Sequence, residues 1–184
     1  MITPDQLLRP ASPETGSTLD RPLEHLTACH RRIEQRLDTL ERAADHLTDK
    51  RSEALEAMEA CFRFFETNGI LHTADEEQSV FPRLQSGLSD AERMFIVQLE
   101  DQHREADRLY AELKAIAAQL QEGQTVSGAL QQRFRTAAGR LAELYRSHIA
   151  TEDCTLIALG QRILSPAELD DISREMKRRR GLPS

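Results

Sequence analysis

Four long stretches of the chain repeat apolar residues at alternating intervals of three and four positions, and this period constrains the fold more than any other feature. The spacing places the apolar side chains on one face of an α-helix, so each stretch is predicted to be an amphipathic helix. Short polar turns separate the stretches, which cover residues 20–47, 52–81, 89–121 and 128–161. Long helices joined by short turns favour an all-α, up-down-up-down four-helix bundle.

Capping residues mark where these helices begin and end. Asp20 is predicted to be the N-cap of the first helix, and Pro82 is predicted to end the second. Ser89 and Glu92 form a Ser-x-x-Glu capping box at the start of the third. A second Ser-x-x-Glu at residues 165–168, with a proline at the first helical position, predicts a shorter fifth helix.

The chain is therefore divided into three parts. Residues 1–19 carry several prolines and no apolar period, so we expect a flexible N-terminal arm. Residues 20–162 form the predicted bundle, and residues 165–184 form the short C-terminal helix with a basic tail. The basic run from Lys177 to Arg180 is predicted to be a solvated helix end.

Composition excludes several classes of protein. Aromatic residues make up 4% of the chain and Trp is absent, as expected for a helical core of Leu, Ile, Ala and Met rather than a β-sandwich. A net charge of −7 argues against binding to nucleic acid. No apolar run is long enough to span a membrane and no signal peptide is evident, so we expect a cytoplasmic protein.

The cysteines do not form a disulfide framework. Cys29, Cys61 and Cys154 are an odd number and lie in no Cys-x-x-Cys spacing. We expect reduced thiols that pack as small buried side chains.

Polar residues interrupt the apolar stripes without changing their period. Along the first stretch, for example, Leu26 is followed at helical spacing by His30 and then Ile33. The polar residues that take core-facing positions in the four helices are His30, His72, Glu76, His103, His148 and Glu152. Two further histidines, His25 and His46, fall off the stripes and are predicted to lie on the surface.

These six polar side chains need a common explanation, because a buried carboxylate is costly unless it is paired or bound to a metal. In helices of alternating direction the six lie at similar heights along the bundle. His72 follows His30 by 42 positions, His148 follows His103 by 45, and each second histidine is followed four residues later by Glu. This two-fold pattern predicts a centre in which two carboxylates bridge two metal ions and two imidazoles bind each ion.

Four imidazoles and two carboxylates favour two iron ions, with manganese as the second choice, over a structural zinc. Side chains predicted to surround a ligand pocket beside these ions are Leu26, Ile33, Phe65, Leu99, Tyr110 and Tyr145. The tyrosines are predicted chiefly to pack, with hydrogen bonding to a bound ligand or radical formation as alternatives. Glu100 and His103 also give the Glu-x-x-His of ferritin-like di-iron enzymes, but that architecture needs the motif twice and one copy is present.

Residues 20 to about 160 resemble the hemerythrin-like family, also called the HHE cation-binding domain. In that family a lone His, a His-x-x-x-Glu, a second lone His and a final His followed by an acid hold a non-haem di-iron centre. The matching positions here are His30, His72 with Glu76, His103, and His148 with Glu152. The oxygen-carrying hemerythrins have a fifth histidine and end in His-x-x-x-x-Asp, whereas this ligand set is closer to the bacterial di-iron proteins that repair iron-sulfur clusters. Residues 1–19 hold no cysteine, unlike the N-terminal segment of those repair proteins.

The resemblance implies three functions. The first is a non-enzymatic di-iron protein that binds dioxygen or nitric oxide for sensing, scavenging or stress defence. The second is an enzyme acting on peroxide or nitric oxide, and the third is an iron donor in cluster repair. The expected partner is a small diatomic ligand or peroxide, and the sequence predicts no oligomeric state.

Overall fold

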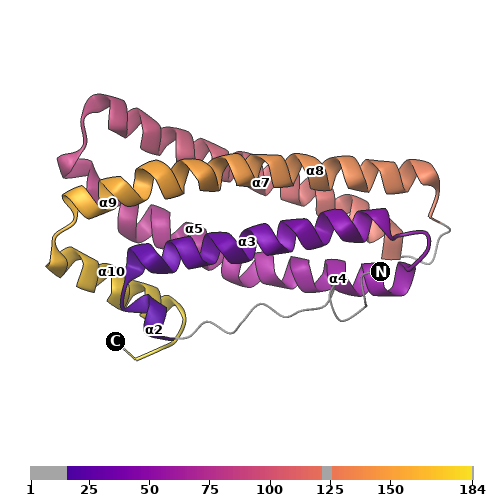
Figure 1. The fold of residues 1–184 in the computed structure, drawn as a ribbon, viewed down its shortest axis with the longest axis horizontal. Helices are drawn as coiled ribbons and strands as arrows, with labels where there is room; N and C mark the ends of the chain where they lie inside the picture. The colour runs from indigo at the N-terminus through magenta and orange to yellow at the C-terminus, as the bar shows by residue number, and fades with distance from the viewer. Residues whose placement is uncertain (1–15, 122–125, 184) are drawn as a thin grey trace.

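The computed structural model describes residues 16–121 and 126–183, which form four long helical segments lying side by side and a shorter helix at one end (Figure 1). Consecutive segments run in opposite directions, which confirms the predicted all-α bundle with its C-terminal helix. Residues 1–15 of the predicted arm lie outside the described residues.

The first long segment is α3 (Pro22–Asp45), preceded by the short α2 (Gly16–Leu19), and the third is α7 (Asp90–Gln121). The second segment consists of α4 (Arg51–Phe64), η1 (Phe65–Gly69), α5 (Ile70–Asp75), η2 (Glu76–Val80) and α6 (Phe81–Leu84), followed by the 3₁₀ turn η3 (Gln85–Gly87). The fourth consists of α8 (Gly128–Thr151), η4 (Glu152–Leu156) and α9 (Ile157–Ile163), and the C-terminal helix is α10 (Pro166–Arg179). Elements η1, η2 and η4 are π-helical turns.

Some predicted helix ends are confirmed and others are wrong. The Ser89 hydroxyl accepts from the Glu92 amide while the Glu92 carboxylate accepts from the Ser89 amide, and Ser165 caps α10 in the same way. The first helix begins at Pro22 rather than after an Asp20 cap, because Gly16–Leu19 of the predicted arm is itself helical. Pro82 does not end the second segment, since it lies at the start of α6, where a helix tolerates a missing amide hydrogen.

The apolar core is split into two clusters by a polar layer. Leu26 and Leu99 belong to the cluster that contacts α10, whereas Ile33 and Ala106 belong to the larger cluster at the other end of the bundle. His30 lies between Leu26 and Ile33 along α3, and His103 lies between Leu99 and Ala106 along α7. The fold therefore places the predicted polar groups between two water-excluding layers.

His25 was predicted to lie on the surface, and this prediction is wrong. Its side chain is fully buried, with Nδ1 3.1 Å from the Thr18 hydroxyl and Nε2 3.5 Å from Cys29 Sγ. Thr18 belongs to α2, which covers this part of α3. His46 is partly exposed beside Asp49, as expected.

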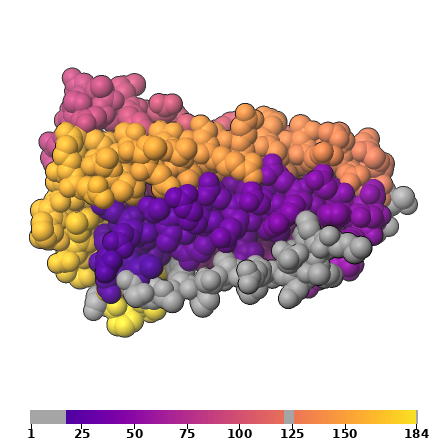
Figure 2. All heavy atoms as spheres, viewed as in Figure 1, coloured from indigo at the N-terminus to yellow at the C-terminus, as the bar shows by residue number. Residues whose placement is uncertain are grey.

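The prediction of a solvated basic C-terminus is also wrong for part of the run. Arg179 and Arg180 pair with Asp75, whose side chain is fully buried, and Lys177 pairs with Asp20. In the space-filling view, the yellow C-terminal helices form one end of the molecule and border the indigo start of the described chain (Figure 2). The basic residues thus fasten α10 to the bundle.

Within the described ranges, no helix is both long enough and apolar enough to cross a membrane.

Candidate metal centre

The structure brings the six predicted polar residues together. The histidines come one from each long segment, His30 from α3, His72 from α5, His103 from α7 and His148 from α8. Glu76 is the first residue of η2 and Glu152 is the first residue of η4. All six side chains are buried, with relative exposures of at most 6%.

The six residues form two groups that share both carboxylates. Within each group, the candidate ligand atoms all lie within 4.8 Å of one another. One group is His30, His72, Glu76 and Glu152, and the other is His103, His148, Glu76 and Glu152. This arrangement fits two neighbouring cations bridged by two glutamates, each also bound by two imidazoles.

The Nε2 atoms of the histidines face the glutamate oxygens. His30 Nε2 lies 3.1 Å from Glu152 Oε2 and 3.7 Å from Glu76 Oε1. His72 Nε2 and His103 Nε2 each lie 3.4 Å from a Glu76 oxygen, and His148 Nε2 lies 3.2 Å from Glu152 Oε2. The bridging role predicted for Glu76 is thus compatible with the geometry, since its two oxygens face histidines of different groups.

Each shared glutamate opens a π-helical turn, a feature that the sequence analysis missed. A π turn adds one residue to a helix and shifts the phase of the residues that follow, and such turns occur often at functional sites. Thr155, three positions after Glu152, is exposed, whereas Leu156, four positions after it, is fully buried. The extra residue in η4 explains this one-position shift.

Outer hydrogen bonds orient three of the four imidazoles. His30 Nδ1 lies 2.7 Å from Asp153 Oδ1, and His103 Nδ1 lies 2.8 Å from Glu77 Oε1. His148 Nδ1 lies 2.9 Å from the Gln102 side-chain oxygen. Since these acceptors take the Nδ1 hydrogen, the Nε2 lone pair is directed at the centre, as in histidines that bind metals.

The donor atoms lack the hydrogen bonds that would satisfy them without a cation. Among the described residues, His30 Nε2 and all four oxygens of Glu76 and Glu152 are buried without a geometrically suitable hydrogen-bond partner. His103 Nε2 and His148 Nε2 lie 3.0 Å apart, although both rings already donate from Nδ1. Two lone pairs at this distance repel unless a proton or a cation lies between them, so the residues fit metal ions.

The metal-free centre balances its carboxylates with protons. Burial works to lower the pKa of His30, but the nearby carboxylates of Glu152 and Glu76 outweigh it and raise this pKa to about 10. Burial also works to lower the pKa of His103, but the neighbouring carboxylates, chiefly Glu76, outweigh it and raise this pKa to about 9. For His72, burial outweighs the Glu76 charge and lowers the pKa to about 4. The centre therefore attracts positive charge to its two carboxylates.

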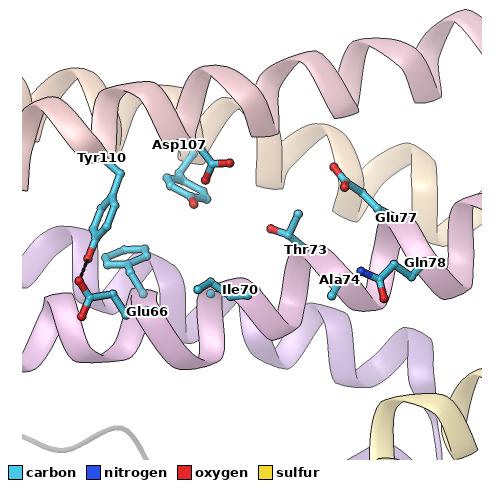
Figure 3. Close-up of a pocket in the computed structure, with 11 residues that line it drawn as sticks. Glu66, Ile70, Thr73, Ala74, Glu77, Gln78, Asp107 and Tyr110 are labelled. Atoms are coloured by element: carbon cyan, nitrogen blue, oxygen red, sulfur yellow. Dashed lines mark hydrogen bonds between the residues drawn. The ribbon is translucent and has the colours of Figure 1, made fainter. Parts of the chain in front are cut away.

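A pocket of about 310 Å³ opens beside the centre, between the second segment and α7 (Figure 3). Three of the predicted pocket residues, Phe65, Tyr110 and Tyr145, line it. The Tyr110 hydroxyl donates to the Glu66 carboxylate at the pocket edge. The other predicted pocket residues, Leu26, Ile33 and Leu99, are buried in the two apolar clusters and do not line this pocket.

The three cysteines are free, and two of them match the prediction of buried packing. Cys29 and Cys61 are buried, and Cys29 Sγ accepts a hydrogen bond from Arg32 at 3.0 Å. Cys154 is exposed, so the prediction is wrong for this residue, which follows Glu152 within η4.

Fold and site together define a helical-bundle protein with a buried histidine and carboxylate centre for cations. The chain matches the sequence model of the hemerythrin HHE cation-binding domain over residues 21–159, and it belongs to this family. A similar protein is an uncharacterized protein of Haemophilus influenzae, which is 28% identical over 170 residues, or 91% of this chain and 95% of the relative.

Proposed function

We propose that this protein holds two iron ions and binds dioxygen or nitric oxide, for sensing, scavenging or stress defence. The proposed ligands are His30 and His72 for one ion and His103 and His148 for the other, with Glu76 and Glu152 shared. A pair of iron ions would supply the electrons and the open coordination positions that these diatomic molecules need. The reduced thiols are in keeping with our expectation of a cytoplasmic location.

One observation carries the proposal. Five buried donor atoms of His30, Glu76 and Glu152 converge without hydrogen-bond partners among the described residues, inside an apolar core. Leaving such atoms unpaired is costly, and cations would remove that cost. Borderline imidazole and hard carboxylate donors together suit iron.

The surroundings of the centre support a small ligand. Val80 and Phe81 on one side and Phe65 on the other are nearly or fully buried, which limits access of water. The pocket lined by Phe65, Tyr110 and Tyr145 reaches Glu77, whose carboxylate binds His103. We propose that a diatomic ligand approaches through this pocket and that the chain contributes orientation and exclusion of water.

Reconstitution tests the proposal. The purified chain is loaded with ferrous iron without oxygen, desalted, analysed for metal, and examined by visible spectroscopy under argon, air and nitric oxide. We expect about two irons per chain, in line with the two donor groups, and a spectrum that depends on the gas. Colourless protein that takes up no iron would refute the proposal. His46→Ala is the matched control, since His46 is partly exposed and pairs with Asp49 away from the centre.

The same iron-loaded protein distinguishes the proposed function from the two alternatives, an enzyme acting on peroxide or nitric oxide and an iron donor. Steady-state consumption of hydrogen peroxide or nitric oxide would identify an enzyme rather than a reversible binder. Transfer of iron to a metal-free acceptor protein would identify an iron donor. For the proposed function we expect a spectrum that returns to its starting form when the gas is removed, with no net consumption.

A further inference from the structure

Helix α10 lies outside the part of the chain that matches the family, yet it packs directly on the segment that supplies two of the proposed ligands. The family match ends at residue 159, whereas α10 covers Pro166–Arg179. It contacts α5 and η2, which carry His72 and Glu76, and also the start of the described chain. Its role is therefore not covered by the matched domain.

The first set of contacts surrounds Asp75, the residue immediately before Glu76. The Asp75 side chain is fully buried, and its oxygens lie 2.7 Å from Arg179 Nη1 and 2.8 Å from Arg180 Nη2. A buried carboxylate that loses its cationic partners destabilises the fold strongly. Arg179 is the last residue of α10 and Arg180 follows it directly, so α10 must be docked for Asp75 to remain inside the bundle.

The second set of contacts lies one turn further along the same segment. Ser79 lies within η2, and its hydroxyl donates to Glu175 Oε2 at 2.5 Å and accepts from Arg179 Nη2 at 2.6 Å. Arg83, in α6, donates to both oxygens of Glu175 at 3.1 and 2.8 Å. Arg179 thus joins Asp75 to Ser79, and Glu175 joins Ser79 to Arg83.

These contacts bracket Glu76. The π turn η2 begins at Glu76 and ends at Val80, and α10 holds the residue before it, a residue within it and a residue after it. A π turn is rare and occurs mostly as a single turn inside an α-helix, so the contacts around it must favour it over the regular helix. If η2 relaxed, the phase of the helix would change and the Glu76 carboxylate would turn away from the four histidines.

We propose that α10 acts as a clamp, in which Glu175, Arg179 and Arg180 hold η2 so that Glu76 faces both cations. This inference rests on the proposed metal site and adds positioning residues to it. The clamp residues contact no proposed ligand atom, so they act through the backbone of η2. Release of α10 would loosen Glu76, the proposed ligand carboxylate of the second segment, and weaken both ions together.

Substitutions within α10 test the clamp in the full chain. Arg179→Gln removes the contacts to Asp75 and Ser79 but leaves Arg180 beside Asp75, so the chain is expected to fold. Glu175→Gln weakens the contacts to Ser79 and Arg83 independently. Arg178→Gln is the matched control, because Arg178 is an exposed arginine next to Arg179. Arg179→Lys keeps the charge near Asp75 and serves as a rescue variant.

Each variant is loaded with ferrous iron, and the rate of iron loss to an excess of a ferrous chelator is measured. We expect loss to be about 10-fold faster for Arg179→Gln and Glu175→Gln, intermediate for Arg179→Lys, and unchanged for Arg178→Gln. The visible spectrum of the loaded Arg179→Gln protein should shift because Glu76 is repositioned. Backbone amides of residues 76–84 should exchange faster in the metal-free variant than in the metal-free wild type.

The outcomes separate the clamp from the metal site. Equal rates of iron loss and equal spectra for Arg179→Gln, Glu175→Gln and Arg178→Gln would overturn the clamp while the metal site stands. Faster amide exchange at residues 76–84 with no change in iron loss would also overturn it, because α10 would then support the fold without positioning Glu76. Wild-type protein that takes up no iron would overturn the proposed function, and the clamp with it.

Discussion

Replacing Glu152 with Gln should weaken both cations at once, because both donor groups contain this carboxylate. The substitution keeps the shape of the side chain and removes its charge. Replacing His148 with Ala removes a donor from one group alone. The two variants therefore differ in how many cations they affect, which depends on the sharing seen in the structure.

The expected loss of iron affinity in each variant follows from the number of donor groups that lose a ligand. Loss of an outer-shell partner at a metal site typically costs about 10 to 100-fold in affinity, or roughly 1.4–2.8 kcal/mol per ion, and this serves as the lower bound for loss of a direct ligand. Since Glu152 belongs to both groups, Glu152→Gln should cost roughly 3–6 kcal/mol summed over the pair. His148→Ala should cost about half as much and leave the His30 and His72 group nearly intact.

The assay is a titration of the metal-free proteins with ferrous iron, followed by metal analysis after desalting. We expect Glu152→Gln to retain little iron and His148→Ala to retain about half of the wild-type content, since one of its two groups is intact. The reasoning would be refuted if Glu152→Gln kept one tight ion while His148→Ala lost both. His46→Ala should behave as wild type.

Four further changes have defined outcomes. Asp153→Ala should weaken iron binding about 10 to 100-fold by releasing His30, as measured by titration, whereas Cys154→Ser beside it should not. Removing iron that was present at 100 times its dissociation constant should lower Tm by about 5–10 °C in a calorimetric scan. Leu113→Ala, at a fully buried position of the larger apolar cluster, should cost about 2–5 kcal/mol of unfolding free energy in urea without changing the iron content. The Arg83 guanidinium holds the pKa of Glu175 below its usual range. This pair therefore stabilises the fold fully above the ordinary carboxyl pKa, and its contribution is lost as the pH falls through the lowered pKa. Glu175→Gln should flatten the acid side of a plot of unfolding free energy against pH.

The helices and the convergence of the six polar residues could be predicted because both follow from periodicity. A residue on an apolar stripe points inward whatever its chemistry, so His30 and His103 could be placed in the core from their neighbours alone. Their common height follows from short turns between helices of similar length. The assignment of all six residues as metal ligands stays a proposal that the titrations above test.

The features that could not be predicted depend on contacts between distant segments or on small irregularities of the backbone. The π turns at Glu76 and Glu152 leave no mark in a three-four pattern, since the sequence is read as a straight helix. The burial of His25 depends on α2, whose four residues are too short to show a period. The pairing of Arg179 with Asp75 joins residues 104 positions apart.

The acid that follows each shared glutamate adds a coupling between the two proposed ions. Glu77 follows Glu76 in the segment of His72, yet it orients His103, which belongs to the other donor group. Asp153 follows Glu152 in the segment of His148, yet it orients His30 of the first group. Each His-x-x-x-Glu-acid motif would thus supply one imidazole to its own proposed ion and one carboxylate to both, and it orients a histidine of the other donor group.

This crossed arrangement makes the occupancy of one group favour the geometry of the other. When an ion fixes His72 and Glu76, it also fixes the adjacent Glu77 and hence the ring of His103. The groups are nevertheless unequal, because His148 Nδ1 is held by Gln102 whereas His72 Nδ1 has no hydrogen-bond partner among the described residues. A less restrained ring costs more entropy to immobilise when it binds, so the group of His103 and His148 should fill first and the group of His30 and His72 should fill second.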